Sequence, residues 1–287
     1  MFRLSILAKD ASSPIRLKAS FREQANCYSR WVSQTGTTSV QSMLRENADL
    51  LAPHIDVLLK DAFEDLTEKA RSFSLDPREK TLSQVAKAAI GFFSGLNKSD
   101  ARPLLLSSED LAGHMPGRHG LDCYDSTGLV MKCISVSAYA YFGKDTDLTF
   151  YFSTRDTDSW LRSTWWQNLR STRLTLDFDD YCARFDGART LQEILQEIEK
   201  DVAPARVVSC ALEDVADRPL GPLDPVLELF DLPGLDRSAL SVLPPENVQP
   251  DVGIDTVFLA LNRSRLPEKD VQDAKRSIRK MARRLED

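Results

Sequence analysis

The chain has 287 residues, of which 42% are hydrophobic and 28% are charged, a composition typical of globular proteins and not of wholesale disorder. Its net charge of −6 disfavours nucleic acid as the main partner, because proteins that bind the phosphate backbone carry a strong basic excess. No stretch reaches the ~18–20 apolar residues of a membrane span, and Lys9 and Asp10 interrupt the first apolar run. We therefore expect no signal peptide, no membrane contact and a cytoplasmic protein.

The cysteine and histidine pattern gives no sign of a metal site. The five cysteines are odd in number and widely spaced, no Cys-x-x-Cys pair occurs, and there are three histidines. A zinc cluster or a disulfide framework would need closer and paired spacings. We expect reduced thiols and no bound metal.

Short β-rich runs alternate with helical segments along the chain. The expected strands are residues 27–33, 103–107, 148–154 and 206–210. The expected helices are residues 38–51, a segment from the Asp-Pro-Arg-Glu run at 76–79 to about 96, 159–169, 190–199 and about 267–285. Such alternation predicts an α/β fold with a central parallel β-sheet flanked by helices, in one domain spanning residues 1–287. Residues 112–125 and 232–253 are expected to be irregular.

One candidate anion site lies at residues 33–39, Ser-Gln-Thr-Gly-Thr-Thr-Ser, between an expected strand and an expected helix. Gly36 allows the backbone to approach a ligand, and a helix N-terminus directs free N–H groups towards an anion. The hydroxyls of Thr37, Thr38 and Ser39 can add hydrogen bonds. The segment lacks the Gly-Lys-Ser/Thr ending of a Walker loop, which disfavours a P-loop kinase. The alternative is a helix with an ordinary hydroxyl N-cap.

A second candidate follows the expected strand at 148–154. Arg155 lies at its end, and Ser163 follows two turns into the next helix. Ligands of open α/β sheets bind at the carboxyl ends of strands, and the planar guanidinium of Arg suits a phosphate. The alternative is a surface Arg paired with Asp156 or Asp158.

These two segments resemble the phosphate-binding elements of sulfotransferases that use 3′-phosphoadenosine 5′-phosphosulfate. The first resembles their 5′-phosphosulfate loop, and the stretch FYFSTRDTDSWLRS resembles their 3′-phosphate element; the similarity covers roughly residues 27–230. The resemblance implies a P-loop, sulfotransferase-like fold and a sulfuryl transfer to a hydroxyl or amine of a small molecule or glycan, with no metal. It implies the following nucleotide ligands: Thr35, Gly36, Thr37, Thr38, Ser39, Arg155 and Ser163.

The chain departs from this family at Gln34, where the family has a Lys that stabilises charge on the leaving oxygen. An amide supplies no positive charge, so transition-state stabilisation is weaker unless Arg30 or Lys132 supplies a cation. The family also uses a base to take a proton from the acceptor, and Glu109 and His114 are our candidates. The catalytic candidates are therefore Gln34, Glu109 and His114. The alternative function is a catalytically impaired nucleotide-binding or interaction module.

Three further features have structural interpretations. The tryptophans at 160, 165 and 166 are expected in the core, the alternative being stacking on adenine. The basic residues between 275 and 284 are expected on the solvated face of the last helix, the alternative being contact with a subunit or an acidic substrate. Arg263 and Arg265 are weaker candidates for the nucleotide site.

Overall fold

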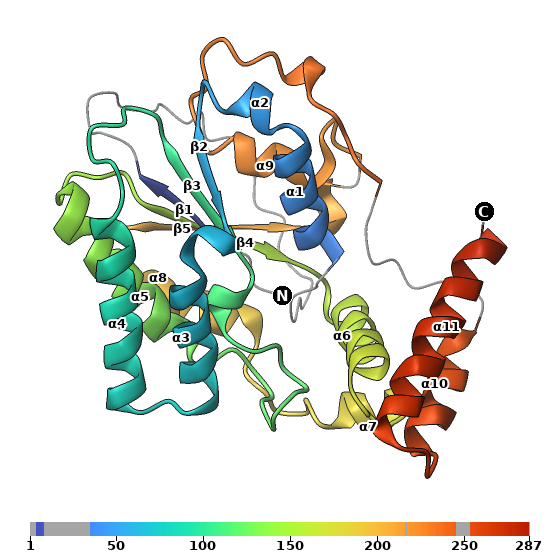
Figure 1. The fold of residues 1–287 in the computed structure, drawn as a ribbon. Coiled ribbons are helices and arrows are strands. Elements are labelled where there is room, and N and C mark those ends of the chain that lie inside the picture. Colours follow the sequence, from blue (N-terminus) through green and yellow to red (C-terminus); the bar gives the residue numbers. More distant parts are fainter. Residues whose placement is uncertain (1–3, 9–34, 216, 245–252, 287) are drawn as a thin grey trace, which may run out of the picture.

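The structure is a computed structural model and describes residues 4–8, 35–215, 217–244 and 253–286. Its strands form one sheet with the order β2-β3-β1-β4-β5. The strands are β1 (Leu4–Ala8), β2 (Asp56–Leu59), β3 (Leu104–Ser108), β4 (Thr149–Thr154) and β5 (Arg206–Ala211). β2 is parallel to β3 and β4 is parallel to β5, whereas β1 is antiparallel to both β3 and β4. The four strands other than β1 therefore run in one direction (Figure 1).

The mixed α/β class expected from the sequence is confirmed, although the sheet is not wholly parallel because β1 is inserted in the opposite direction. The strands expected at 103–107, 148–154 and 206–210 correspond to β3, β4 and β5. The strand expected at 27–33 lies outside the described residues. β2 was missed because it has only four residues, begins with Asp56 and is half-buried along its length, so neither an apolar run nor an alternation marks it.

Helices make up most of the remaining described chain. They are α1 (Thr35–Glu46), α2 (Ala48–Leu51), α3 (Glu64–Leu75), α4 (Glu79–Ser94), α5 (Thr127–Phe142), α6 (Thr157–Ser171), α7 (Phe178–Ala183), α8 (Leu191–Val202), α9 (Asp224–Leu227), α10 (Ile254–Arg263) and α11 (Glu268–Glu286). Short 3-10 turns link several of them, including η1 (Lys60–Phe63), which follows β2. All five expected helices are present, the expected segment 38–51 being divided into α1 and α2, and the C-terminal helix being α11.

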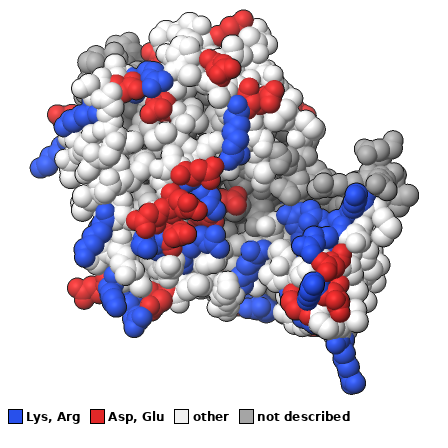
Figure 2. All heavy atoms as spheres, viewed as in Figure 1, with Lys and Arg blue, Asp and Glu red and all other residues white. Residues whose placement is uncertain are grey.

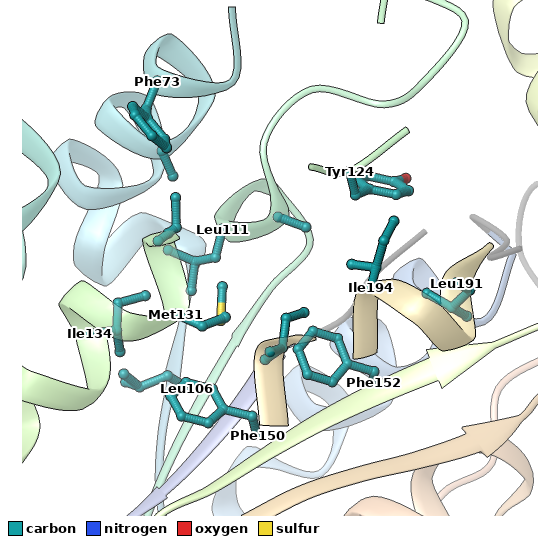
Figure 3. Packing of buried hydrophobic residues seen from close by; sticks show 14 of the residues in the cluster. Phe73, Leu106, Leu111, Tyr124, Met131, Ile134, Phe150, Phe152, Leu191 and Ile194 are labelled. Atoms are coloured by element: carbon teal, nitrogen blue, oxygen red, sulfur yellow. The ribbon is translucent and has the colours of Figure 1, made fainter. Parts of the chain in front are cut away.

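Hydrophobic residues pack against both faces of the sheet. Leu106, Phe150 and Phe152 face a core that includes residues of α3, α4, α5, α6 and α8 (Figure 3). The intervening residues Leu105 and Tyr151 face a second core formed with α1, α2 and α9. This alternation follows from the two-residue period of a strand. β3 is buried along its whole length and β4 up to Ser153, so both strands are packed on both faces almost to their carboxyl ends.

α6, α10 and α11 form a helical group beside the sheet (Figure 1). The three tryptophans of α6 are buried as expected, and Trp166 stacks on Phe258 with ring centroids 5.4 Å apart. One expectation for α11 was wrong: Lys275 is 1% exposed and does not lie on a solvated face. Its Nζ donates hydrogen bonds to the carbonyl oxygens of Leu169 and Thr172, at 2.8 and 2.7 Å, near the C-terminus of α6. A cation at that end is favoured by the helix dipole.

Within the described residues, none of the helices combines the length and the hydropathy that crossing a bilayer requires. The two segments expected to be irregular largely are. Residues 113–126 contain no regular element, and in the described part of 232–253 the only such element is the 3-10 turn Arg237–Ala239.

Candidate functional site

The carboxyl ends of β2, β3, β4 and β5 lie on one edge of the sheet because these strands share a direction. Charged residues follow each strand at this edge: Lys60 after β2, Glu109 after β3, Arg155 after β4 and Glu213 shortly after β5. Ligands of open α/β sheets bind at this edge. We therefore expect a ligand site at this edge of the sheet.

The N-terminus of α1 lies near this edge. Gln41, on the second turn of α1, donates a hydrogen bond from Nε2 to the carbonyl oxygen of Ser107, near the carboxyl end of β3 (3.3 Å). The expected phosphate residues from Thr35 to Ser39 form the first residues of α1, so the helix begins three residues before the expected position 38. The strand expected before them lies outside the described residues. Of these, Thr38 is half-buried and Ser39 is 4% exposed. Gln34 and Arg30 lie outside the described residues.

Arg155 directly follows β4, as expected, and its side chain is 25% exposed. Its Nε lies 3.6 Å from Oε1 of Glu213, so the carboxylate in this ion pair is not the Asp156 or Asp158 considered from the sequence. Burial lowers the pKa of the Arg155 guanidinium and raises the pKa of the Glu213 carboxyl. Asp156 caps α6 by accepting a hydrogen bond from the backbone N–H of Ser159.

Ser163 lies on α6 and is half-buried. Gln167 is four residues further on, and residues at this spacing share one side of a helix. Gln167 lines a cavity described below, so Ser163 lies on the same side of α6 as that cavity, one turn nearer to the end of β4. Within the described residues, no hydrogen bond joins Ser163 to Arg155.

A polar cavity of about 190 Å³ opens beside the ends of β2 and β3. Its lining comes from η1, α3, α6 and the segment after β3, and comprises Lys60, Arg71, Glu109, Asp110, Gly113, His114, Met115, Arg118, Tyr124 and Gln167. The structure thus brings Glu109 and His114, the two candidate bases, to one cavity. On the face shown in Figure 2, acidic and basic side chains are intermixed over the region of η1 and α3.

The loop that carries His114 is held by close backbone packing. The backbone N–H of His114 donates to Oγ of Ser74 at 2.9 Å. Gly113 and Gly117 have φ angles of +89° and +84°, a region that side chains rarely adopt. A Cβ on Gly117 would overlap the Tyr181 hydroxyl and lie 2.7 Å from Nδ2 of Asn168. The loop therefore has one well-defined path along the cavity.

His114 is neutral near pH 7. Burial lowers its pKa to about 4, and the positive charges of Arg71 and Arg118 and the neighbouring His119 act in the same direction, whereas Asp110 opposes them. The His114 and His119 rings meet edge to face with centroids 4.8 Å apart. A neutral imidazole in a polar cavity can accept a proton, although a base with so low a pKa is weak.

Arg118 is a cavity residue that the sequence did not single out. Its Nε donates to Oδ1 of Asn168 at 2.7 Å and its Nη2 donates to Oγ of Ser171 at 2.6 Å. Both acceptors are neutral, and across the described ranges no carboxylate lies within ion-pair distance of Arg118. Burial lowers the pKa of its guanidinium. The sequence places Arg118 in the Gly- and His-rich segment 113–120, which marks it as part of an irregular loop. The sequence does not predict that its side chain contacts Asn168.

Two other cations considered from the sequence, Lys132 for the charge of the family Lys and Arg263 for the nucleotide site, pair with carboxylates elsewhere. Lys132 on α5 pairs with Asp201 on α8 at 3.3 Å and is not part of the cavity lining. Arg263 pairs with Asp177 and donates to the carbonyl oxygen of Thr175, so it fixes the segment before α7.

Within the described part of the chain, no cluster of three or more Cys, His, Asp or Glu side chains is arranged to hold a metal ion. The family models, curated proteins and solved structures with which the chain was compared include no match.

Proposed function

We propose that this protein binds 3′-phosphoadenosine 5′-phosphosulfate at the carboxyl edge of its sheet and transfers the sulfuryl group to a hydroxyl or amine of a small-molecule or glycan acceptor. The proposal is supported chiefly by one observation: the start of α1, Arg155 and the cavity with Glu109 and His114 all belong to the same sheet edge. The P-loop, sulfotransferase-like version of the α/β fold is part of this proposal.

In the proposed arrangement the first turn of α1 binds the 5′-phosphosulfate through its free N–H groups and the hydroxyls of Thr37, Thr38 and Ser39. Arg155 and Ser163 bind the 3′-phosphate. The acceptor oxygen or nitrogen forms a bond to sulfur while the bond between sulfur and the bridging phosphate oxygen breaks. Adenosine 3′,5′-bisphosphate leaves with that electron pair, and the acceptor proton passes to Glu109 or His114. Catalysis would depend on positioning and on charge stabilisation.

One observation favours the second candidate function, a nucleotide-binding or interaction module with little catalytic power. Arg155 already has a carboxylate partner in Glu213, which competes with a phosphate for the guanidinium. Gln34, at the position of the family Lys, supplies no cation to the leaving oxygen.

Calorimetric titration with adenosine 3′,5′-bisphosphate and with adenosine 5′-monophosphate tests the nucleotide site. We expect the bisphosphate to bind at least ~10-fold more tightly, because a hydrogen bond to a charged group contributes ~1.5–3 kcal/mol. Equal affinities would contradict the assignment of Arg155 and Ser163. If the bisphosphate binds selectively, incubation with the sulfuryl donor and a panel of acceptors then separates the enzyme from the binding module.

A further inference from the structure

The cavity beside β2 and β3 carries an excess of positive charge. Lys60 and Arg71 both pair with the same carboxylate, Asp110, whose side chain is 14% exposed. With Arg118 and Glu109 included, the lining holds three cations and two carboxylates, and His114 is neutral near pH 7. An anion entering the cavity would therefore meet one uncompensated positive charge.

Among the described residues, Arg118 has no carboxylate within ion-pair distance, and the Glu109 charge acts on it only from further away. Its guanidinium is half-buried and bonded to the neutral side chains of Asn168 and Ser171. Partial burial removes part of the hydration of this charge, so an anion from outside the chain that contacts the guanidinium would stabilise it. Among the described residues its Nη1 makes no hydrogen bond, which leaves donors for a ligand in the cavity.

The guanidinium is also held in a fixed orientation. Asn168, which accepts from Arg118, donates from Nδ2 to the Tyr181 hydroxyl at 3.0 Å, and both Asn168 and Tyr181 are fully buried. Gly117, next to Arg118, packs directly on this pair. An Arg fixed in this way loses little side-chain entropy when it binds a planar anion, and its fork matches a carboxylate.

We propose that this cavity recognises a carboxylate on the acceptor molecule, with Arg118 as its principal ligand. The proposal rests on the proposed function in one respect, namely that the occupant is an acceptor. The volume of about 190 Å³ is much larger than a single bound water needs and leaves room for a small acidic group with the atoms attached to it. The same cavity presents Glu109 and His114, so an acceptor held by its carboxylate would lie beside the candidate bases.

The test uses 4-hydroxybenzoate and its uncharged analogue 4-hydroxybenzamide, titrated into the full-length protein without any nucleotide. We expect the carboxylate to bind at least ~10-fold more tightly than the amide, because the difference is a charge-assisted hydrogen bond. Arg118→Gln should remove this preference and Arg118→Lys should keep part of it. Arg184→Gln is the matched control, since Arg184 pairs with Asp122 and does not line the cavity.

A second readout follows His114 by NMR. A carboxylate in the cavity is expected to raise the pKa of His114 from about 4, because a nearby negative charge stabilises the imidazolium. The amide should leave it unchanged. This comparison and the ligand preference use the wild-type protein, so both remain decisive if an Arg118 variant does not fold.

The proposal is overturned if the wild-type protein binds the two ligands equally or binds neither, or if Arg184→Gln removes the preference as fully as Arg118→Gln. Its failure is distinguishable from failure of the proposed function. Selective binding of adenosine 3′,5′-bisphosphate without a preference for the carboxylate would leave the nucleotide site standing and refute the acceptor site. Selective binding of the carboxylate without any nucleotide binding would support the carboxylate site and refute the nucleotide site.

Discussion

Replacing Glu213 by Gln separates a nucleotide-binding Arg155 from a structural ion pair. In the free protein the Glu213 carboxylate lies 3.6 Å from Nε of Arg155 and would compete with a 3′-phosphate. The backbone N–H of Asp156 donates to Oε1 of Glu213 at 3.3 Å, and the amide oxygen of the introduced glutamine can accept the same hydrogen bond. The variant Glu213→Gln therefore removes the charge with little change in shape.

The expected gain can be estimated from the exposure of the pair. The two side chains are 25% and 43% exposed, so solvent screens their attraction, and pairs of this kind contribute ~0.2–1 kcal/mol. Removing the competitor should tighten binding of adenosine 3′,5′-bisphosphate by up to ~5-fold, at ~1.4 kcal/mol for each factor of ten. Adenosine 5′-monophosphate, which lacks the 3′-phosphate, should bind Glu213→Gln and the wild-type protein equally.

Arg155→Ala is the opposite arm of the same calorimetric assay. It should abolish the preference for the bisphosphate while lowering the melting temperature of the free protein by no more than a few degrees. The reasoning is refuted if Glu213→Gln and Arg155→Ala both destabilise the protein strongly and neither changes the preference between the two nucleotides. That result would mean that the ion pair of Arg155 and Glu213 stabilises the strand ends and does not bind a nucleotide.

Three further predictions concern the leaving group, the cavity loop and the buried lysine. Gln34→Lys should raise or create sulfuryl transfer, measured with the donor and an acceptor panel, because each ~1.4 kcal/mol of charge stabilisation gives a tenfold change in rate. Unchanged activity in a protein that binds the donor would contradict the alignment of Gln34 with the family Lys. Gly117→Ala should lower the free energy of unfolding by ~1–3 kcal/mol in urea titrations, because the new Cβ would overlap Tyr181 and the backbone has a positive φ. Gly120 also has a positive φ but has open space around it, so Gly120→Ala is the control that measures the effect of φ alone. Burial lowers the pKa of Lys275 to about 8 from 10.5, so the unfolded state binds more protons between these values and stability should rise from pH 8 to pH 10.5. Lys275→Met should lose this rise in denaturation measured across that range, and the exposed Lys269→Met should keep it.

Sequence patterns predicted the elements that carry strong local signals. The capping box of Thr190 and Glu193 is present, with the Thr190 backbone N–H donating to the Glu193 carboxylate at 2.6 Å and the Glu193 N–H donating to Oγ1 of Thr190 at 3.2 Å. β4 was found because aromatic residues dominate it and both faces are buried. α5 was missed because small polar residues such as Ser135 and Ser137 are buried while Leu129 and Val136 are exposed, which obscures the helical stripe.

The candidate site was predictable where it depends on strand ends and not where it depends on long-range packing. Arg155 and Glu109 were expected at the ends of strands and are found there. The ion-pair partner of Arg155 was missed because Glu213 is distant in the chain, whereas the sequence suggests only local carboxylates. Arg118 was missed for the same reason: its orientation depends on Asn168, which is fifty residues further along the chain.

The position of β1 determines how the proposed ligands share the sheet edge. β3 and β4, which Glu109 and Arg155 follow, are separated by this strand, and neighbouring strands lie ~4.8 Å apart, so β3 and β4 are about 10 Å apart across the sheet. β4 also ends two residues beyond the level at which β3 ends, which moves the two strand ends further apart. That spacing is too large for one small anion to contact both groups. It suits a nucleotide whose 3′-phosphate lies at the end of β4 and whose reactive group points towards the cavity at β2 and β3. The nucleotide and the carboxylate ligand should consequently bind together without competing, as a transfer reaction requires.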